Sequence, residues 1–234
     1  MDIPLHEIGL HLVTAPAQGG RAELLRIVDA SIDGGLRLVQ HRDKECATRA
    51  AMCDVQELVA LCRPRGVLVI VNDRIDVALA TGADGVHLGP DDLDWQQARR
   101  LAPPPFILGC TAAVSELVRE AIACGADYAG AGPAHPTTTK RGAGSPLEAD
   151  DFRKLRSACR SRGGAPLPLV AVGGVEPGKA AALIAAGATA VAVSAAIMRA
   201  GDPRATTRKL VEEVETARFL ASHDPSSGSR RHGP

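Results

Sequence analysis

Aromatic residues are scarce in this sequence, which has three Phe, one Tyr and one Trp among 234 residues. Base-stacking platforms for single-stranded nucleic acid depend on aromatic rings, as do sugar-stacking lectin sites. A surplus of positive charge is also missing, because 27 Lys and Arg side chains balance 27 Asp and Glu side chains. A protein that neutralises nucleic-acid phosphates is expected to be basic. We therefore expect small-molecule partners and no nucleic acid.

Paired cysteines and long apolar runs are lacking as well. The six cysteines are scattered, with no C-x-x-C pair and no Cys/His cluster at zinc spacing. This pattern fits a reduced compartment better than a disulfide framework. No apolar run reaches the length of a signal peptide or of a membrane span. We expect a cytoplasmic protein without a membrane partner, and the sequence leaves its oligomeric state open, a homo-oligomer included.

A recurring unit organises the chain: a short apolar run, then polar or Gly residues, then a helical stretch that ends in Gly-Ala. Three of these junctions are nearly alike and begin at Gly82, Gly125 and Gly187. In each, the glycine is suited to end a helix in the left-handed region before a short buried strand. Parallel strands need such helical crossovers.

The apolar runs predict eight strands, and the stretches between them predict helices. The predicted strands are Leu10–Thr14, Leu36–Gln40, Val67–Val71, Gly85–Leu88, Phe106–Gly109, Tyr128–Ala131, Leu169–Val172 and Ala190–Val193. The predicted helices include Arg21–Ile32, Ala47–Leu61, Leu93–Leu101, Ser115–Ala123, Glu148–Cys159, Pro177–Ala186 and Pro203–Phe219. Eight strands, each followed by a helix, are typical of an α/β fold of the (β/α)8 TIM-barrel type. A doubly wound open sheet is the alternative, which the lack of a G-x-G-x-x-G turn after any strand disfavours.

One barrel domain is expected over residues 1–220. Hydrophobic residues make up 45% of the chain, enough for a sizeable core in a single domain. Residues 221–234 are predicted to form a disordered C-terminal tail, because that stretch has no apolar periodicity.

Polar side chains follow the second predicted strand, at the end of the barrel where the active sites of this fold lie. Gln40, Arg42 and Lys44 stand at alternate positions and face one way if the chain stays extended. An amide, a guanidinium and an ammonium in a row would suit a diphosphate. A solvated loop with a local Arg–Asp contact explains the same residues about equally well.

Two carboxylates follow the third and fourth predicted strands. Asp73 and Asp92 would lie on neighbouring strand ends, where they can share one hard cation such as Mg²⁺ with substrate phosphate oxygens. Alternatively, each aspartate caps the helix that follows it, a role that does not exclude a metal. His87, in the same region, fits a packed and hydrogen-bonded residue as well as a catalytic one.

The longest break in periodicity follows the sixth predicted strand, over residues 130–146. Its Gly, Pro and Thr content, with Lys140, fits a mobile lid that reaches anionic oxygens better than a plain surface loop. Gly173 and Gly174 follow the seventh strand and Ser194 the eighth, where backbone N–H groups of this fold bind phosphate. Two anion sites without an evident nucleophile and base indicate a transferase that depends on electrostatics.

With these motifs in this order, the sequence resembles the thiamine-phosphate synthase family over roughly residues 8–220. The motifs are LVT from Leu12, LVQHRDK from Leu38, VIVNDR from Val69, GADGVHLG from Gly82, GPAHPTTTK from Gly132 and VGGV from Val172. The resemblance implies an enzyme that joins a hydroxymethylpyrimidine diphosphate to a thiazole phosphate and releases pyrophosphate. It also implies a dissociative mechanism, in which the diphosphate leaves first and the thiazole nitrogen captures the methylene cation.

The resemblance assigns roles to individual residues. The residues that it implies hold the pyrimidine diphosphate are Gln40, Arg42, Lys44, Asn72 and Lys140. The residues that it implies bind the thiazole phosphate are Thr137, Thr139 and the backbone at Gly174, Val193 and Ser194. The expected catalytic residues are Arg42, Lys140 and Thr111, the last beside the reacting pyrimidine. The expected cofactor is Mg²⁺, bound by Asp73 and Asp92.

Three positions depart from the family pattern. His41 replaces an aliphatic residue, His135 stands where an aromatic ring is common, and Pro90 stands where Gln is frequent. The first two concern the packing of the substrates, and the third concerns a contact near Asp92. The implied metal and phosphate positions are unaffected.

Alternative functions on the same barrel remain open from the sequence. A related thiazole tautomerase typically lacks the Pro-Thr-x-Thr-Lys segment and has a catalytic His after the fifth strand. Here the segment 136–140 is present and Thr111-Ala-Ala has no His. A non-catalytic thiamine-phosphate sensor would need a broken carboxylate pair. A sugar-phosphate epimerase or isomerase would need Asp73 to transfer protons without a metal.

Overall fold

The eight predicted strands are present and close into one parallel barrel. The computed structural model describes residues 4–137, 144–160 and 165–223. Each strand pairs with the next along the chain, and β8 pairs with β1 through Leu10 opposite Val191. The strands are β1 (Leu10–Val13), β2 (Leu38–His41), β3 (Leu68–Asn72), β4 (Gly85–Leu88), β5 (Ile107–Thr111), β6 (Tyr128–Ala131), β7 (Leu169–Val172) and β8 (Ala190–Val193). This closure confirms the (β/α)8 barrel and excludes the open sheet.

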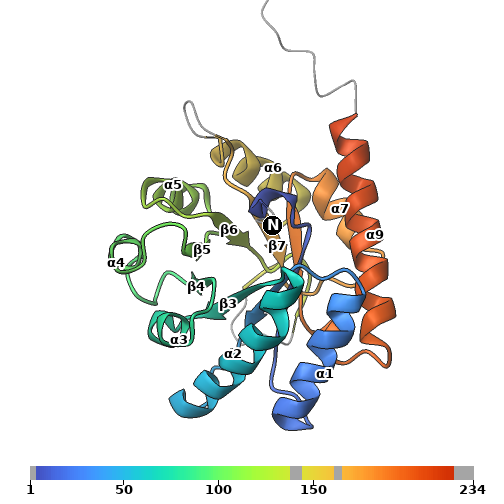
Figure 1. Cartoon of the computed structure of the whole chain (residues 1–234). Helices are drawn as coiled ribbons and strands as arrows, with labels where there is room; N and C mark the ends of the chain where they lie inside the picture. The colour runs from blue at the N-terminus through green and yellow to red at the C-terminus, as the bar shows by residue number, and fades with distance from the viewer. Residues whose placement is uncertain (1–3, 138–143, 161–164, 224–234) are drawn as a thin grey trace, which may run out of the picture.

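Helices surround the barrel as a ring (Figure 1). They are α1 (Gly20–Asp33), α2 (Thr48–Cys62), α3 (Ile75–Thr81), α4 (Trp95–Leu101), α5 (Ser115–Ala123), α6 (Ala149–Ala158), α7 (Ala180–Ala185), α8 (Ala195–Met198) and α9 (Pro203–Ser222), with 3-10 turns η1 (Leu5–Glu7) and η2 (Arg63–Arg65). The helices α3 and α8 were not predicted from the sequence; α8, with 4 residues, is only about one turn long. No helix in this part of the chain is both long and apolar enough to cross a membrane.

Several boundaries differ from the prediction by one to three residues. β2 continues to His41, one residue beyond the predicted end. α4 begins at Trp95, because Asp94 caps this helix by accepting a hydrogen bond from the backbone N–H of Gln97. The predicted tail begins at residue 221, but α9 continues to Ser222. The rest of that stretch, 224–234, lies outside the described residues. The junction glycines have φ values of 70°, 74° and 114°, which confirms their left-handed conformation.

The alternation of side chains along the strands separates two cores. Val39, Val69 and Val71 are buried between the strands and the helices. Leu38 and Ile70 point into the barrel and pack there against Ile8, which follows η1. Figure 1 shows this first segment lying across the near end of the barrel. Because apolar side chains seal the amino end of the barrel interior, a cavity can form only where polar side chains line the carboxyl end.

Candidate active site

A cavity of about 670 Å³ lies at the carboxyl ends of the strands. The predicted site residues that line it are Gln40, Arg42, Lys44, Asn72, Asp73, Asp92, Thr111, Thr137, Gly174 and Ser194. Val193 is buried at 1% exposure and is not part of the lining, so only its backbone could serve the site. Thr139 and Lys140 lie outside the described residues. The structure therefore gathers the two predicted anion sites into one cavity.

The end of β2 keeps the extended conformation that the alternating pattern predicts. Gln40, Arg42 and Lys44 all line the large cavity, whereas His41 and Asp43 line only a smaller one, to which Arg42 also contributes. The polar residues of the pattern thus face the same way, as expected for a period of two. The departure at His41 therefore does not alter the packing around a substrate directly.

Asp73 sits in an uncommon backbone conformation beside β3. Its φ is 64°, and among the described residues it is the one non-glycine with a positive φ. The N–H of Arg74 donates to the carbonyl of Asn72 at 2.8 Å, which makes a γ-turn centred on Asp73, and the Asp73 N–H donates to the His87 carbonyl. Such a conformation costs free energy and is enriched at functional sites. It brings the Asp73 carboxylate within 3.0 Å of the Lys44 ammonium.

The carboxylate of Asp92 faces that of Asp73. Asp92 Oδ2 accepts a hydrogen bond from the Gly89 N–H at 2.6 Å, which fixes the loop after β4. Burial raises the pKa of the Asp92 carboxyl, the Gly89 N–H lowers it in part, and the neighbouring Asp73 carboxyl raises it further. The alternative role of these two aspartates as helix caps is wrong, because Asp94 caps α4, and the N-cap of α3 is Arg74, with no side-chain hydrogen bond to the cap.

These two carboxylates form a donor set that suits a small hard cation. Like charges that face each other in a partly buried site repel, and a divalent ion between them removes that repulsion. Mg²⁺ is usually held by one or two carboxylates, with water and substrate phosphates completing its coordination. In the described part of the chain no group of three or more His, Cys, Asp or Glu residues is arranged to hold a metal. The pair therefore suits a Mg²⁺ ion whose remaining ligands would include oxygens of a bound diphosphate.

A hydrogen-bonded cluster of polar side chains forms the floor of the cavity. His87 Nδ1 lies 3.0 Å from Tyr128 Oη, and His87 Nε2 lies 2.9 Å from Thr111 Oγ1. The amide nitrogen of Gln40 donates to Tyr128 Oη at 3.5 Å. The Tyr128 side chain is 1% exposed and packs against the backbone of Gly109. A Cβ at position 109 would lie only 2.1 Å from Cζ of the tyrosine ring. The glycine in β5 therefore makes room for the tyrosine.

His11 completes this floor from β1. Its ring packs edge-on against Tyr128 with the centroids 5.4 Å apart, and its side chain is buried. Burial lowers the pKa of His11 to about 3, with a further contribution from His87. Burial also raises the pKa of Tyr128 well above its ordinary value. Both side chains are therefore neutral at physiological pH. Neither residue was predicted to belong to the site, because a single polar residue in a buried strand gives no indication of its neighbours across the barrel.

The cluster suits recognition better than nucleophilic catalysis. Thr111 and His87 resemble a hydroxyl and its base, but the group that orients the other nitrogen of His87 is the Tyr128 phenol. A nucleophile–base pair is normally supported by a carboxylate, which stabilises the imidazolium that forms. A neutral phenol gives no such stabilisation. Neutral donors and acceptors beside aromatic faces are instead suited to a flat, polar, heteroaromatic ring.

The residues of the second predicted anion site lie where β7 and β8 end. Gly174 has a φ of 64°, and a Cβ there would lie 2.7 Å from the Cβ of His135 and from the carbonyl oxygen of Pro136. The backbone is therefore close-packed against the loop that begins after β6. Ser194 Oγ is buried and has no hydrogen-bond partner among the described residues. A buried hydroxyl without a partner is costly, and a bound phosphate oxygen would satisfy it.

Comparisons with known proteins agree with this geometry. A sequence model of the family described as thiamine monophosphate synthase matches residues 10–197. The chain belongs to this family. Among curated members, the thiamine-phosphate synthase of Moorella thermoacetica is 39% identical over 209 residues, which cover 89% of this chain and 97% of the relative. The thiamine biosynthesis bifunctional protein ThiM/ThiE of Symbiobacterium thermophilum is 42% identical over 82% of this chain.

Coverage differs among the synthase relatives. The chain spans 39% of the bifunctional protein and 55% of the thiamine-phosphate synthase of Thermosynechococcus vestitus, to which it is 43% identical. A solved thiamine phosphate pyrophosphorylase from Pyrococcus furiosus is 32% identical, with a TM-score of 0.77 over 91% of this chain and 98% of that chain. The N-acetylmannosamine-6-phosphate 2-epimerase of Clostridium perfringens, at 12% identity and a TM-score of 0.62, shares the fold alone.

Proposed function

We propose that this chain is a thiamine-phosphate synthase, which condenses hydroxymethylpyrimidine diphosphate with hydroxyethylthiazole phosphate and releases pyrophosphate. The observation that carries the proposal is the shared cavity. Asp73, Asp92 and Lys44 lie at one side of it, and Gly174 and Ser194 lie at the other. The first group of residues suits a diphosphate with its metal ion, and the second group suits a separate phosphate. Two such sites in one cavity support a reaction between two phosphorylated substrates.

The diphosphate would bind at the ends of β2 and β3. Arg42 offers a planar guanidinium, and Lys44 offers an ammonium that already contacts Asp73. Asp73 and Asp92 would hold Mg²⁺, which when bound neutralises charge on the departing pyrophosphate. Asn72 lies in the same wall, and Lys140, outside the described residues, would add a further cation. Negative charge that develops on the leaving group would then be surrounded by positive charge.

The pyrimidine would stack in the lower part of the cavity, against the polar floor. Gln40, Thr111 and His87 present an amide and a hydrogen-bonded hydroxyl–imidazole pair to the nitrogens of the ring. The thiazole phosphate would bind to Thr137, Thr139 and the backbone near Gly174, Val193 and Ser194. This arrangement would keep the methylene carbon of one substrate near the nitrogen of the other.

The chemical step would need no base. The bond between the methylene carbon and the diphosphate oxygen breaks, and its electron pair leaves with pyrophosphate. The aminopyrimidine ring delocalises the positive charge that remains on the methylene carbon. The thiazole nitrogen then donates its lone pair to that carbon, and no proton is transferred. The floor supports this proposal, because His11 and Tyr128 are neutral and none of His11, His87 and Tyr128 presents a carboxylate to the cation.

The thiazole tautomerase is not favoured as an alternative. The curated relatives that match over nearly their full length are named thiamine-phosphate synthases. At the end of β5, Thr111 is followed by Ala112 and Ala113, so the imidazole expected of the tautomerase is not present there. The cytoplasmic location inferred from the cysteines stays a prediction, although all six thiols are free.

The proposal is tested by following pyrophosphate release from the purified chain with both substrates, with and without Mg²⁺. We expect metal-dependent release, and a fall of about 100-fold or more in Asp73→Asn, because the metal loses a ligand. Asp91→Asn is the matched control, since Asp91 also lines the cavity but is not among the groups that shift the pKa of Asp92. Release that needs no metal, or that is equally fast in Asp73→Asn, would reject the assignment.

A further inference from the structure

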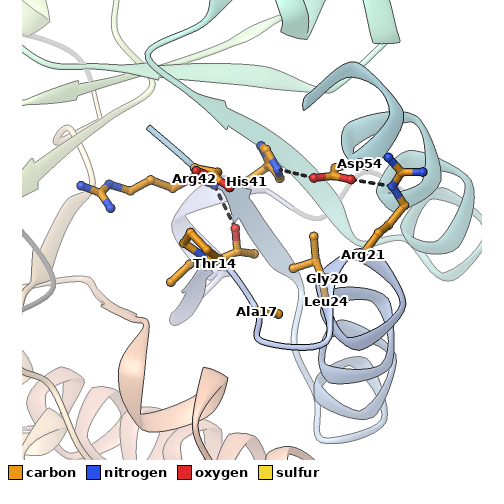
Figure 2. A pocket seen from close by; sticks show the side chains of 11 residues that line it. Thr14, Ala17, Gly20, Arg21, Leu24, His41, Arg42 and Asp54 are labelled. Atoms are coloured by element: carbon orange, nitrogen blue, oxygen red, sulfur yellow. Dashed lines mark hydrogen bonds and ion pairs between the residues drawn. The ribbon is translucent and has the colours of Figure 1, made fainter. Parts of the chain in front are cut away.

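The end of β2 is supported from the side opposite the large cavity by a line of three polar side chains. His41 Nε2 lies 3.6 Å from Asp54 Oδ2 on α2, and the His41 side chain is 5% exposed. The other oxygen of Asp54 accepts a hydrogen bond from Arg21 Nε on α1 at 2.6 Å. Figure 2 shows these three side chains in line from β2 to α1, while Arg42 points the other way. We name them the Arg21–Asp54–His41 network.

The surroundings of this network are loosely packed. A cavity of about 110 Å³ lies between the loop after β1, the first turn of α1 and His41 (Figure 2). Apolar side chains therefore do not fill this side of the strand end completely, and polar contacts contribute to fixing it. A second polar contact adjoins the network, because the backbone N–H of Arg42 donates to Thr14 Oγ1 at 2.9 Å. The last residues of β2 are thus attached to β1, α1 and α2 through hydrogen bonds and charge.

The position of His41 in the chain couples this network to the large cavity. His41 lies between Gln40 and Arg42, which face the opposite side of the strand. Any shift or rotation of the strand end at His41 therefore changes where those two side chains reach. A displacement of about 1 Å in a substrate-positioning group can reduce the rate about 100-fold.

We propose that the Arg21–Asp54–His41 network is a positioning device that sets Gln40 and Arg42 for the pyrimidine diphosphate, an inference that rests on the proposed function. It acts without touching the substrate. The network lies behind the ends of β1 and β2, on the far side from the second anion site, which lies at the ends of β7 and β8. Its loss should therefore affect one substrate and not the other.

The charges around His41 are consistent with this role. Burial lowers the pKa of His41, and Asp54 and Asp43 oppose that effect. Arg21 from α1 and Glu57 from α2 form an ion pair on this face, and Arg42 also lines the smaller cavity. A neutral imidazole with its proton on Nε2 can still point that N–H at Asp54, so the contact does not require a charged ring.

Steady-state kinetics with both substrates tests the proposal. In His41→Leu and Asp54→Asn, we expect KM for the pyrimidine diphosphate to rise about five- to tenfold, the effect of one lost charge-assisted contact. KM for the thiazole phosphate should stay the same. His41→Gln should restore the wild-type KM, because its amide nitrogen can take the place of Nε2. In the double variant the effect should not exceed the larger single effect, because both changes break one network.

The matched control is Asp127→Asn at the opposite end of the barrel. Asp127 accepts a hydrogen bond from Arg99 at 2.6 Å, the same distance as in the Arg21–Asp54 pair, and it does not line the cavity. This variant should lose stability without a change in either KM. Unchanged KM values in His41→Leu and Asp54→Asn, or equal rises for both substrates, would overturn the proposal.

A binding measurement separates failure of this inference from failure of the proposed function. Calorimetry with inorganic pyrophosphate and Mg²⁺ measures the diphosphate site without turnover. We expect Kd for pyrophosphate to rise about five- to tenfold in His41→Leu, with Asp127→Asn at the wild-type value. A wild-type chain that forms no product would reject the synthase function. Unchanged pyrophosphate affinity in His41→Leu would reject the positioning network, whether or not the wild type turns over.

Discussion

His11 should make the barrel sensitive to acid. Its pKa is about 3 in the folded chain, against an ordinary value of 6.5, because the ring is buried. As the pH falls below 6.5, the unfolded chain takes up a proton at this position and the folded chain does not. Stability that is present above pH 6.5 is therefore lost progressively down to about pH 3. For these two pKa values, the loss between pH 7 and pH 5 is about 2 kcal/mol.

Replacing the imidazole isolates this effect. His11→Phe keeps the edge-on contact with Tyr128 and removes the titrating group. Urea unfolding at pH 7 and pH 5 gives the free energy of unfolding of each variant. The wild type should lose about 2 kcal/mol more between the two pH values than His11→Phe does. His11→Leu is a second variant, in case the larger ring strains the barrel.

The exposed His6 provides the control for this experiment. His6→Gln changes a histidine that is not buried, so it should keep the wild-type pH dependence. If the wild type and His11→Phe lose the same stability between pH 7 and pH 5, then His11 is not a buried neutral residue. The description of the cavity floor as an uncharged surface would then be wrong.

Three further substitutions test other parts of the site. Asp92→Asn removes the repulsion from Asp73, so thermal unfolding should show Tm raised by about 2–4 °C while pyrophosphate release is lost. Gly109→Ala forces Tyr128 aside, so urea unfolding should show a loss of about 1–3 kcal/mol, and KM for the pyrimidine diphosphate should rise. Gly174→Ala strains a left-handed residue, so kinetics should show a higher KM for the thiazole phosphate alone. A lower Tm in Asp92→Asn would contradict the repulsion between the two carboxylates. An unchanged free energy of unfolding in Gly109→Ala would contradict the close contact with Tyr128, and an unchanged KM for the thiazole phosphate in Gly174→Ala would contradict the second anion site.

The barrel was predictable because its signals are local. The repeated Gly-Ala junctions end helices, and the short apolar runs after them are long enough for only one strand each. The orientation of Gln40, Arg42 and Lys44 followed from the period of two in an extended chain. The same period explains why His41 faces the helices. These features need no knowledge of the rest of the fold.

The floor of the cavity was not predictable, because it depends on contacts across the barrel. His87 on β4 meets Tyr128 on β6 and Thr111 on β5 only because the strands are tilted and staggered. The helix-cap alternative for Asp92 failed for a local reason, since Asp94 stands two residues nearer the first turn of α4. The positive φ of Asp73 has no sequence signal, because it is imposed by the turn that leads from β3.

The central claim is that one cavity joins two phosphorylated substrates, and its most direct test is to identify the products. The purified chain with Mg²⁺ and both substrates should form thiamine phosphate and pyrophosphate in equal amounts, and neither product when one substrate is omitted. Pyrophosphate release from the pyrimidine diphosphate alone, or consumption of the thiazole phosphate without condensation, would contradict the account.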